Sequence, residues 1–234
     1  MSNISWSYSS LKTFQQCPRK YYHLKVKKDV KDSGSEATLY GKELHKAAED
    51  YIKDGVPIPE RFGFIQGMLD SLVRIEGTKH CEYEMGLMKE GDSLSPCGFN
   101  TKGFWWRGIA DLLIVNEDKG VAHLVDYKTG KNAKFADTQQ LDVLAAATFI
   151  HFPKIHTVKS ALLFVVSKEF IQKKHTVDMK LEYLEPQIQQ LSRLEAAFEN
   201  GTWNPVTSGL CKFCPVFSCE HNPKGLDHAL RQQT

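Results

Sequence analysis

The sequence predicts an α/β domain with a short cysteine-rich loop near its C-terminus. Segments with helical and strand periodicity alternate along the 234 residues, with no internal repeat and no low-complexity linker. Near the C-terminus, Cys211, Cys214 and Cys219 lie within nine residues in GLCKFCPVFSCEH. We therefore expect a main domain at 1–204 and a metal-binding loop and tail at 205–234.

The composition excludes several classes of protein. Thirty lysines and arginines against 28 acidic side chains leave a net charge of +2, so an anionic partner must meet a local patch of positive charge. The longest apolar stretches, such as 161–166, are far shorter than the ~18 residues of a membrane span. The start MSNISWSYSS lacks the features of a secretory signal. We expect a cytoplasmic protein without membrane association.

The first elements are helical. Residues 9–16 form a short helix that ends before Cys17, because the next residue is a proline. The window 19–31 is the most basic in the chain and is either a solvated face or a phosphate-binding edge. Apolar side chains three and four residues apart then predict helices at 40–53 and 61–75.

The remaining elements alternate between strand and helix. Helical periodicity at 138–152 and 185–199 contrasts with short β-rich segments between and before them. These strands are predicted at 82–88, 104–115, 121–128, 159–166 and 175–181.

The segment FWWRGIADLLIVNEDKGVAHLVDYKTGK is predicted to form a hairpin around the turn 116–120. If the turn is centred between residues 118 and 119, paired positions sum to 237, and Asp111 lies opposite Asp126; the register could also be shifted by one residue. Opposed side chains have Cβ atoms about 4.5 to 5.5 Å apart, where two carboxylates repel unless a cation lies between them. Lys128 shares the face of Asp126 by strand alternation.

This patch suits metal-assisted hydrolysis of a phosphodiester. Carboxylates bind Mg²⁺ or Mn²⁺, and a lysine beside the ion can position water and balance charge. His45 could add an imidazole ligand, which favours Mn²⁺, or it could be an ordinary helical histidine. The alternative for the patch as a whole is a solvated strand end with a simple ion pair.

The clustered cysteines predict a site for iron–sulfur or zinc, because soft thiolates on short spacers can wrap one centre. The fourth ligand is either Cys17 or His221. Cys81 and Cys97 are isolated in the sequence and are expected to be plain thiols.

Four segments of the chain carry a family resemblance. They are Gly41, His45 and Glu49 spaced four apart, GIAD at 108–111, DYKTG at 126–130, and Gln140. In order and spacing they resemble the motifs of the PD-(D/E)xK nuclease superfamily, especially its RecB-like branch, which includes the AddB nuclease domain and the CRISPR-adaptation exonucleases. SYSSLKTFQQCPRKYY and the cysteine loop resemble members that bind a four-iron four-sulfur (4Fe-4S) cluster. The resemblance implies a restriction-endonuclease-like fold with a central mixed sheet flanked by helices.

The resemblance also implies roles for individual residues. The metal ligands would be His45, Asp111, Asp126 and the backbone carbonyl of Tyr127. Lys128 would be the catalytic lysine, and Gln140 would support it or the DNA backbone. The family's tyrosine after that glutamine is replaced by Leu144, while Asp137 with Gln140 also fits a helix capping box. Glu84 either faces this site or is a solvated glutamate.

For the cluster, the resemblance favours Cys17 as the fourth ligand beside Cys211, Cys214 and Cys219. The expected function is a stand-alone, metal-dependent DNA exonuclease acting on duplex ends or single strands, with roles in recombination, replication or repair. Homo-oligomers and replication or recombination proteins are the expected partners. The alternatives are a non-cleaving nucleic-acid-binding or scaffold protein on a nuclease fold, and a zinc-stabilised binding module.

Overall fold

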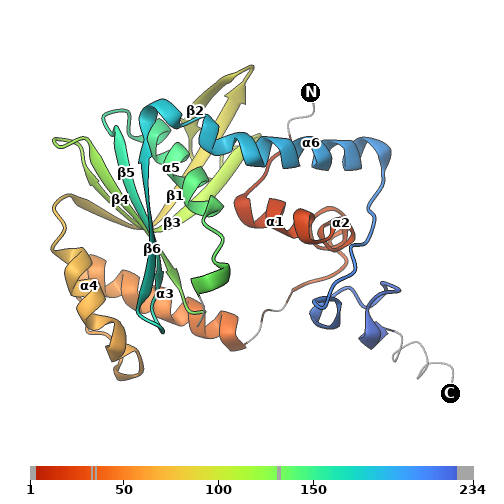
Figure 1. Cartoon of the computed structure of the whole chain (residues 1–234), viewed down its shortest axis with the longest axis horizontal. Helices are drawn as coiled ribbons and strands as arrows, with labels where there is room; N and C mark the ends of the chain where they lie inside the picture. The colour runs from red at the N-terminus through yellow and green to blue at the C-terminus, as the bar shows by residue number, and fades with distance from the viewer. Residues whose placement is uncertain (1–3, 33, 35, 131–132, 226–234) are drawn as a thin grey trace. The chain divides into compact units, whose positions relative to one another are not determined.

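The computed structural model describes residues 4–32, 34, 36–130 and 133–225 (Figure 1). By its packing the chain divides into two compact units. We call Gly34–Glu185 the sheet unit, and Met1–Ser33 together with Pro186–Thr234 the cysteine unit. The cysteine unit thus includes the N-terminal helices and the last long helix, whereas the sequence placed a boundary near residue 204.

The sheet unit contains a six-stranded mixed sheet with the order β2-β1-β3-β4-β5-β6. All neighbouring strands are antiparallel except β4 and β5, which are parallel. The helix α5 (Gln139–His151) connects these two, as a parallel pair requires. The strands are β1 (Thr78–Glu90), β2 (Ser93–Cys97), β3 (Trp106–Asn116), β4 (Val121–Lys128), β5 (Thr157–Phe164) and β6 (Glu169–Thr176). The expected mixed sheet flanked by helices is confirmed.

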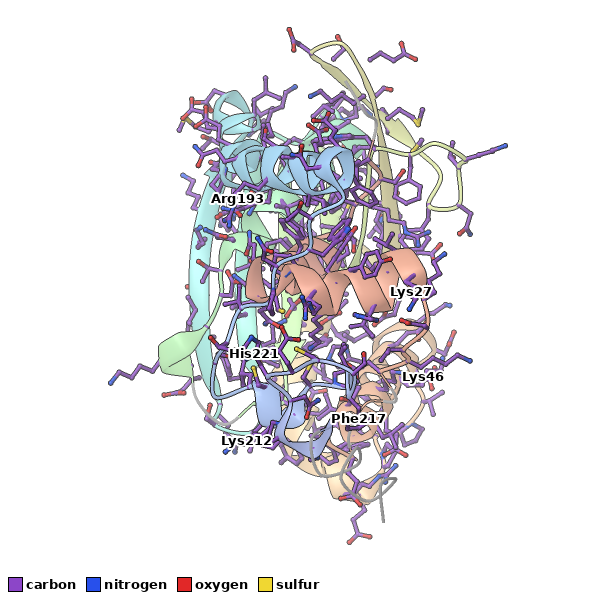
Figure 2. The ribbon with its side chains drawn as sticks, turned by 90° about the vertical axis from the view of Figure 1, so that its right-hand side faces the viewer. Lys27, Lys46, Arg193, Lys212, Phe217 and His221 are labelled. Carbon is purple, nitrogen blue, oxygen red and sulfur yellow. The ribbon has the colours of Figure 1, made fainter. Side chains whose placement is uncertain are left out.

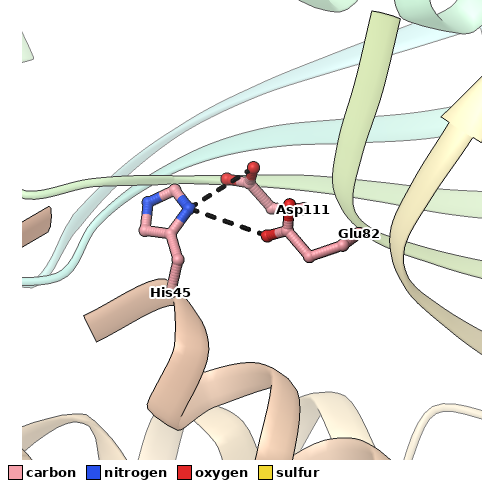
Figure 3. A group of neighbouring side chains, drawn as sticks. All are labelled: His45, Glu82 and Asp111. Atoms are coloured by element: carbon pink, nitrogen blue, oxygen red, sulfur yellow. Dashed lines mark ion pairs between the residues drawn. The ribbon is translucent and has the colours of Figure 1, made fainter. Parts of the chain in front are cut away.

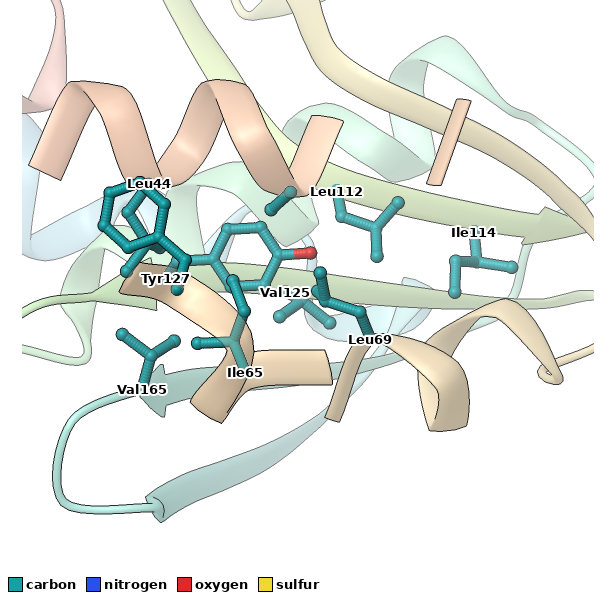
Figure 4. Packing of buried hydrophobic residues seen from close by; sticks show 10 residues of the cluster. Leu44, Ile65, Leu69, Leu112, Ile114, Val125, Tyr127 and Val165 are labelled. Atoms are coloured by element: carbon teal, nitrogen blue, oxygen red, sulfur yellow. The ribbon is translucent and has the colours of Figure 1, made fainter. Parts of the chain in front are cut away.

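Helices α3 (Glu36–Asp54) and α4 (Gln66–Val73) pack on one face of the sheet, and the 3-10 helix Glu60–Ile65 leads into α4 (Figures 1 and 4). Apolar side chains of these helices meet the alternate side chains of β3 and β4 that point to this face. The fully or almost fully buried members are Leu44, Ala48, Phe62, Ile65, Leu69, Leu112, Ile114, Val125, Tyr127 and Val165. This core fixes α3, and with it His45, over the middle of β3 and the C-terminal end of β4.

The cysteine unit contains α1 (Tyr8–Gln16), α2 (Pro18–Tyr21), a π-helix (Tyr22–Lys27) and α6 (Glu185–Asn200). Ser7 caps α1, and Ser10 completes the capping box. Its core is aromatic: Trp203 stacks on Tyr21 with ring centroids 6.0 Å apart and meets Phe198 edge to face at 4.9 Å. The loop after Trp203 is therefore anchored to the N-terminal helices.

Two strand predictions differ from the structure. The strand β2 was not predicted, and the strand predicted at 175–181 lies instead at Glu169–Thr176, followed by the 3-10 helix Val177–Met179. Both β2 and β6 are edge strands, where exposure of one side weakens the apolar alternation on which the prediction depends. No helix within the described ranges is both long and apolar enough to cross a membrane.

Candidate metal centre

The alternation of side chains along β1 is interrupted at Glu82. Cys81 packs against the core beneath α3 and α4, whereas the ring of Tyr83 lies against Phe152, just after α5, with centroids 5.5 Å apart. In a regular strand residues 81 and 83 would share a face. Glu82 between them has φ = +47°, the left-handed region that non-glycine residues rarely adopt.

The β1–β3 ladder keeps its register on both sides of this point but skips Glu82 and Asp111, which lie opposite each other. These two acidic residues are thus released from regular strand geometry. In a regular strand Asp111 and Leu112 would point to opposite faces of the sheet. Here Leu112 packs in the core under α3, and the interruption lets the Asp111 side chain reach His45 of α3 as well. Strain of this kind tends to occur at functional sites.

His45, Glu82 and Asp111 form a compact group (Figure 3). His45 Nδ1 lies 3.5 Å from Asp111 Oδ1 and 3.9 Å from Glu82 Oε1. One ligand atom from each of the three residues lies within 4.8 Å of the others. On its other side, His45 Nε2 lies 3.2 Å from the carbonyl oxygen of Tyr127.

The β3–β4 register follows the predicted sum of 237, from Asn116 opposite Val121 to Leu112 opposite Val125. Asp111 and Asp126 come next, where this ladder ends while β4 continues to pair with β5. The backbone N–H of Tyr127 therefore needs another acceptor, and it donates to Asp111 Oδ2 at 2.7 Å.

Asp126 has different partners from Asp111. It is only 3% exposed, and its Oδ2 lies 2.5 Å from Lys128 Nζ. No hydrogen bond of good geometry reaches this oxygen from the described residues. Lys128 Nζ also donates to Gln140 Oε1 of α5 at 3.2 Å. The predicted pair of acids is therefore split between a histidine side and a lysine side of one centre.

The protonation of this centre reflects burial and mutual charge. Burial, then the charge of Asp111, raises the pKa of Asp126 to about 6, and Lys128 opposes that shift. Burial also raises the pKa of Glu82, again with help from Asp111. For His45 burial acts to lower the pKa, but the hydrogen bond and charge of Asp111 and the charge of Glu82 leave it above its ordinary value.

A cleft of about 640 Å³ opens beside the group. Gly41, His45 and Glu49 recur every four residues along α3, so they form one stripe that lines the cleft. Glu82 and two lysines, Lys42 and Lys46, line it as well. The lining therefore carries two lysines and two glutamates, and Lys46 Nζ pairs with Glu49 Oε2 at 3.2 Å and with Asp50 Oδ1 at 2.8 Å.

A family profile matches the sequence over residues 5–219, and that profile describes the PD-(D/E)XK nuclease superfamily. The chain belongs to the PD-(D/E)XK nuclease superfamily. No protein with a curated description matches the sequence. A crystal structure from Eubacterium rectale, provisionally named an exonuclease, is similar in fold with a TM-score of 0.52 and 16% identity, over 91% of this chain and 87% of that one. The structure of SSO0001 matches with a TM-score of 0.47 and 14% identity, over 95% and 88% of the two chains.

The centre of this PD-(D/E)XK nuclease fits a hard divalent cation. It offers carboxylate and imidazole ligands within reach of one another, a nearby backbone carbonyl, and beside them the buried carboxylate of Asp126, which is paired with Lys128. His45 and Asp111 were predicted as ligands, and Tyr127 and Asp126 lie at the edge of the group. Glu82 was not predicted. Glu84, the glutamate considered instead, is exposed on β1 and is not part of this group.

Helix α5 carries two positions of the family's glutamine–tyrosine motif, Gln140 and Leu144. Gln140 contacts Lys128 as the resemblance implied, whereas Leu144, at the family's tyrosine position, is buried. The capping-box interpretation is wrong: Asp137 accepts a hydrogen bond from the backbone N–H of Gln139, and Gln140 turns to the lysine.

The four predicted cluster cysteines all line one small cavity of about 50 Å³ in the cysteine unit, together with His221. Val206 N–H donates to Cys17 Sγ and Ser208 N–H to Cys211 Sγ, each at 3.4 Å. Among the described residues, no three of the sulfurs lie within 4.8 Å of one another. Cys81 and Cys97 lie on β1 and β2 and do not line this cavity.

Glu82→Gln is expected to weaken Mn²⁺ binding at least about tenfold, because an amide removes one of the charges facing His45 and Asp111. Isothermal titration calorimetry at neutral pH measures the effect. Glu84→Gln, two residues along the same strand, is the matched control and should bind Mn²⁺ as the wild type does. Equal affinities for all three proteins would exclude Glu82 as a ligand.

Proposed function

We propose that this nuclease is a divalent-metal-dependent exonuclease that hydrolyses phosphodiester bonds at DNA ends or in single strands. The observation that carries the proposal is the His45–Glu82–Asp111 group, which borders an open cleft and lies beside the buried Asp126 and its partner Lys128. When bound there, Mn²⁺ or Mg²⁺ would polarise the phosphoryl oxygen and lower the pKa of a water molecule.

The chain's own residues supply the rest. Lys128 is held from two sides, by Asp126 and by Gln140, while about a third of its side chain remains exposed. Its ammonium is therefore oriented and reachable, and can bind a non-bridging phosphate oxygen or orient water as negative charge develops. In the lining of the cleft, Lys42 offers positive charge to the backbone of the polynucleotide without reading its bases, whereas Lys46 already pairs with Glu49 and Asp50.

The decisive test is cleavage of end-labelled DNA in Mn²⁺ or Mg²⁺. Linear single strands, linear duplexes and covalently closed single-stranded circles are compared. An exonuclease degrades linear DNA and leaves the circles intact. Cleavage of circles would instead indicate an endonuclease, and no cleavage of any substrate in either metal would indicate the non-cleaving nucleic-acid-binding alternative.

We also propose that Cys17, Cys211, Cys214 and Cys219 bind a 4Fe-4S cluster. Supporting this, the four side chains line one cavity and backbone N–H groups point at two of the sulfurs, as suits thiolates. The cluster would join the start of the chain to its end.

Cys17→Ser is expected to abolish the broad visible absorption near ~400 nm of anaerobically purified protein and to reduce stability by about 4 kcal/mol, because a cross-link closing a loop of most of the chain is lost. Absorption spectra and urea denaturation measure the two effects. Cys97→Ser is the control and should keep both properties. A colourless wild-type protein that contains zinc would overturn the assignment.

A further inference from the structure

Two phenylalanine rings beside the cysteine cavity are left uncovered. Phe213 is 71% exposed and Phe217 is 55% exposed, on either side of Cys214 in the sequence. The loop that carries them is well anchored: Val216 and Asn222 are each only 1% exposed. Two solvent-exposed apolar rings on a well-packed loop indicate a binding surface rather than a loosely packed loop.

The anchoring is specific. Asn222 Nδ2 donates to the carbonyl oxygens of Cys214 at 2.8 Å and Val216 at 3.1 Å, which closes the loop between the two rings. Lys212 Nζ lies 5.1 Å from the centre of the Phe213 ring. A charged group thus accompanies the first ring.

Positive charge is concentrated in the same unit. Residues 17–31 and 205–225 carry eight lysines and arginines against two carboxylates, in a chain whose net charge is only +2. Both carboxylates are already paired: Asp29 Oδ2 lies 2.7 Å from Lys27 Nζ, and Glu220 pairs with Arg19. The surplus is therefore available to an anionic ligand. Lys212, Phe217 and His221 are labelled on the cysteine loop in Figure 2.

We infer that Phe213 and Phe217 form a stacking platform for unpaired bases of a single-stranded nucleic acid, with Lys212 and neighbouring lysines contacting its phosphates. Aromatic side chains stack on any base, but the bases of a duplex are already stacked on one another. An apolar protein partner would cover the rings without requiring the surplus charge. The inference deepens the proposed function, because it names the form of substrate that this nuclease holds.

The test is fluorescence anisotropy of the full-length protein with a labelled thymidine oligonucleotide in EDTA, so that binding is measured without cleavage. A strand of equal length without bases keeps the phosphates and removes the stacking. The wild type should bind the normal strand at least about tenfold more tightly than the abasic strand. The double variant Phe213→Ala/Phe217→Ala should bind both strands equally and weakly.

Phe213→Trp/Phe217→Trp should retain the preference for bases, since it keeps the aromatic planes. Phe64→Ala removes an exposed aromatic ring of the sheet unit and should bind as the wild type does. Equal binding of normal and abasic strands by the wild type would overturn the inference, even if the alanine variant fails to fold. Base-dependent binding without cleavage in Mn²⁺ or Mg²⁺ would refute the nuclease proposal and leave the platform standing.

Discussion

Lys128→Ala is expected to lower the rate of the proposed DNA cleavage by about 100- to 10,000-fold, the usual contribution of one positioned acid–base or charged group. The expectation depends on the position of its ammonium, 2.5 Å from Asp126 Oδ2 and 3.2 Å from Gln140 Oε1. Both contacts orient the group without burying it. Single-turnover cleavage of end-labelled DNA in Mn²⁺ measures the rate, and anisotropy in EDTA shows that DNA binding persists.

Lys173 provides a close control. Its Nζ also lies 2.5 Å from a carboxylate, that of Asp142, and its side chain has the same 34% exposure as that of Lys128. Lys173→Ala therefore removes an equivalent ion pair from the same sheet, outside the centre. We expect it to leave the cleavage rate within about twofold of the wild type. Equal rates for Lys128→Ala and the wild type would remove Lys128 from the mechanism.

The sequence predicted the lysine side of the centre well because that side depends on local geometry. A short turn at 116–120 sets the hairpin register, and the observed pairs sum to 237 as expected. Strand alternation then places Asp126 and Lys128 on one face. Their ion pair and the contact with Gln140 follow from elements that are regular in the structure.

The histidine side could not be predicted in the same way. Glu82 joins the group because β1 and β3 lose their regular alternation at the same level, and Glu82 adopts a positive φ. Nothing in the residue types nearby signals such a break, and strict alternation treats Glu82 and Glu84 alike. The register of β1 against β3 would identify Glu82 as the residue opposite Asp111, but β2 and a loop separate these strands in the sequence.

Contacts between distant parts of the chain were also beyond local reasoning. Cys17 reaches the cysteine loop because Trp203 anchors that loop to the N-terminal helices, through stacking on Tyr21 and a tilted ring contact with Tyr22. Residue spacing alone left both Cys17 and His221 open as the fourth ligand. In the structure both line the cavity, and a backbone N–H donates to the sulfur of Cys17.

Asp126→Asn is expected to abolish cleavage and yet to stabilise the metal-free protein by about 1 to 2 kcal/mol at neutral pH. The pKa of Asp126 is about 6 in the fold, raised from 3.8. A carboxyl group whose folded pKa is raised favours the fold less as pH increases between these two values, because the unfolded chain ionises first. Above about pH 6 Asp126 is ionised in the folded state as well, and burial of its charge then lowers the free energy of unfolding by the full amount. Asparagine removes this loss of stability, but it also removes the stabilising ion pair with Lys128, so the net gain is smaller.

Urea denaturation in EDTA measures this difference, which should be near zero or reversed at pH 4.5 and should favour the variant at pH 7.5. Asp142→Asn is the control, because Asp142 pairs with Lys173 at the same distance, and this variant should gain no stability. Saturating Mn²⁺ should stabilise the wild type and not Asp126→Asn, so the order of stabilities reverses when metal is added. A variant less stable than the wild type in EDTA at pH 7.5 would show that Asp126 supports the fold by itself. A reversed order of stabilities on addition of Mn²⁺ would show instead that burying the Asp126 carboxylate destabilises the fold, and that the bound cation offsets this destabilisation.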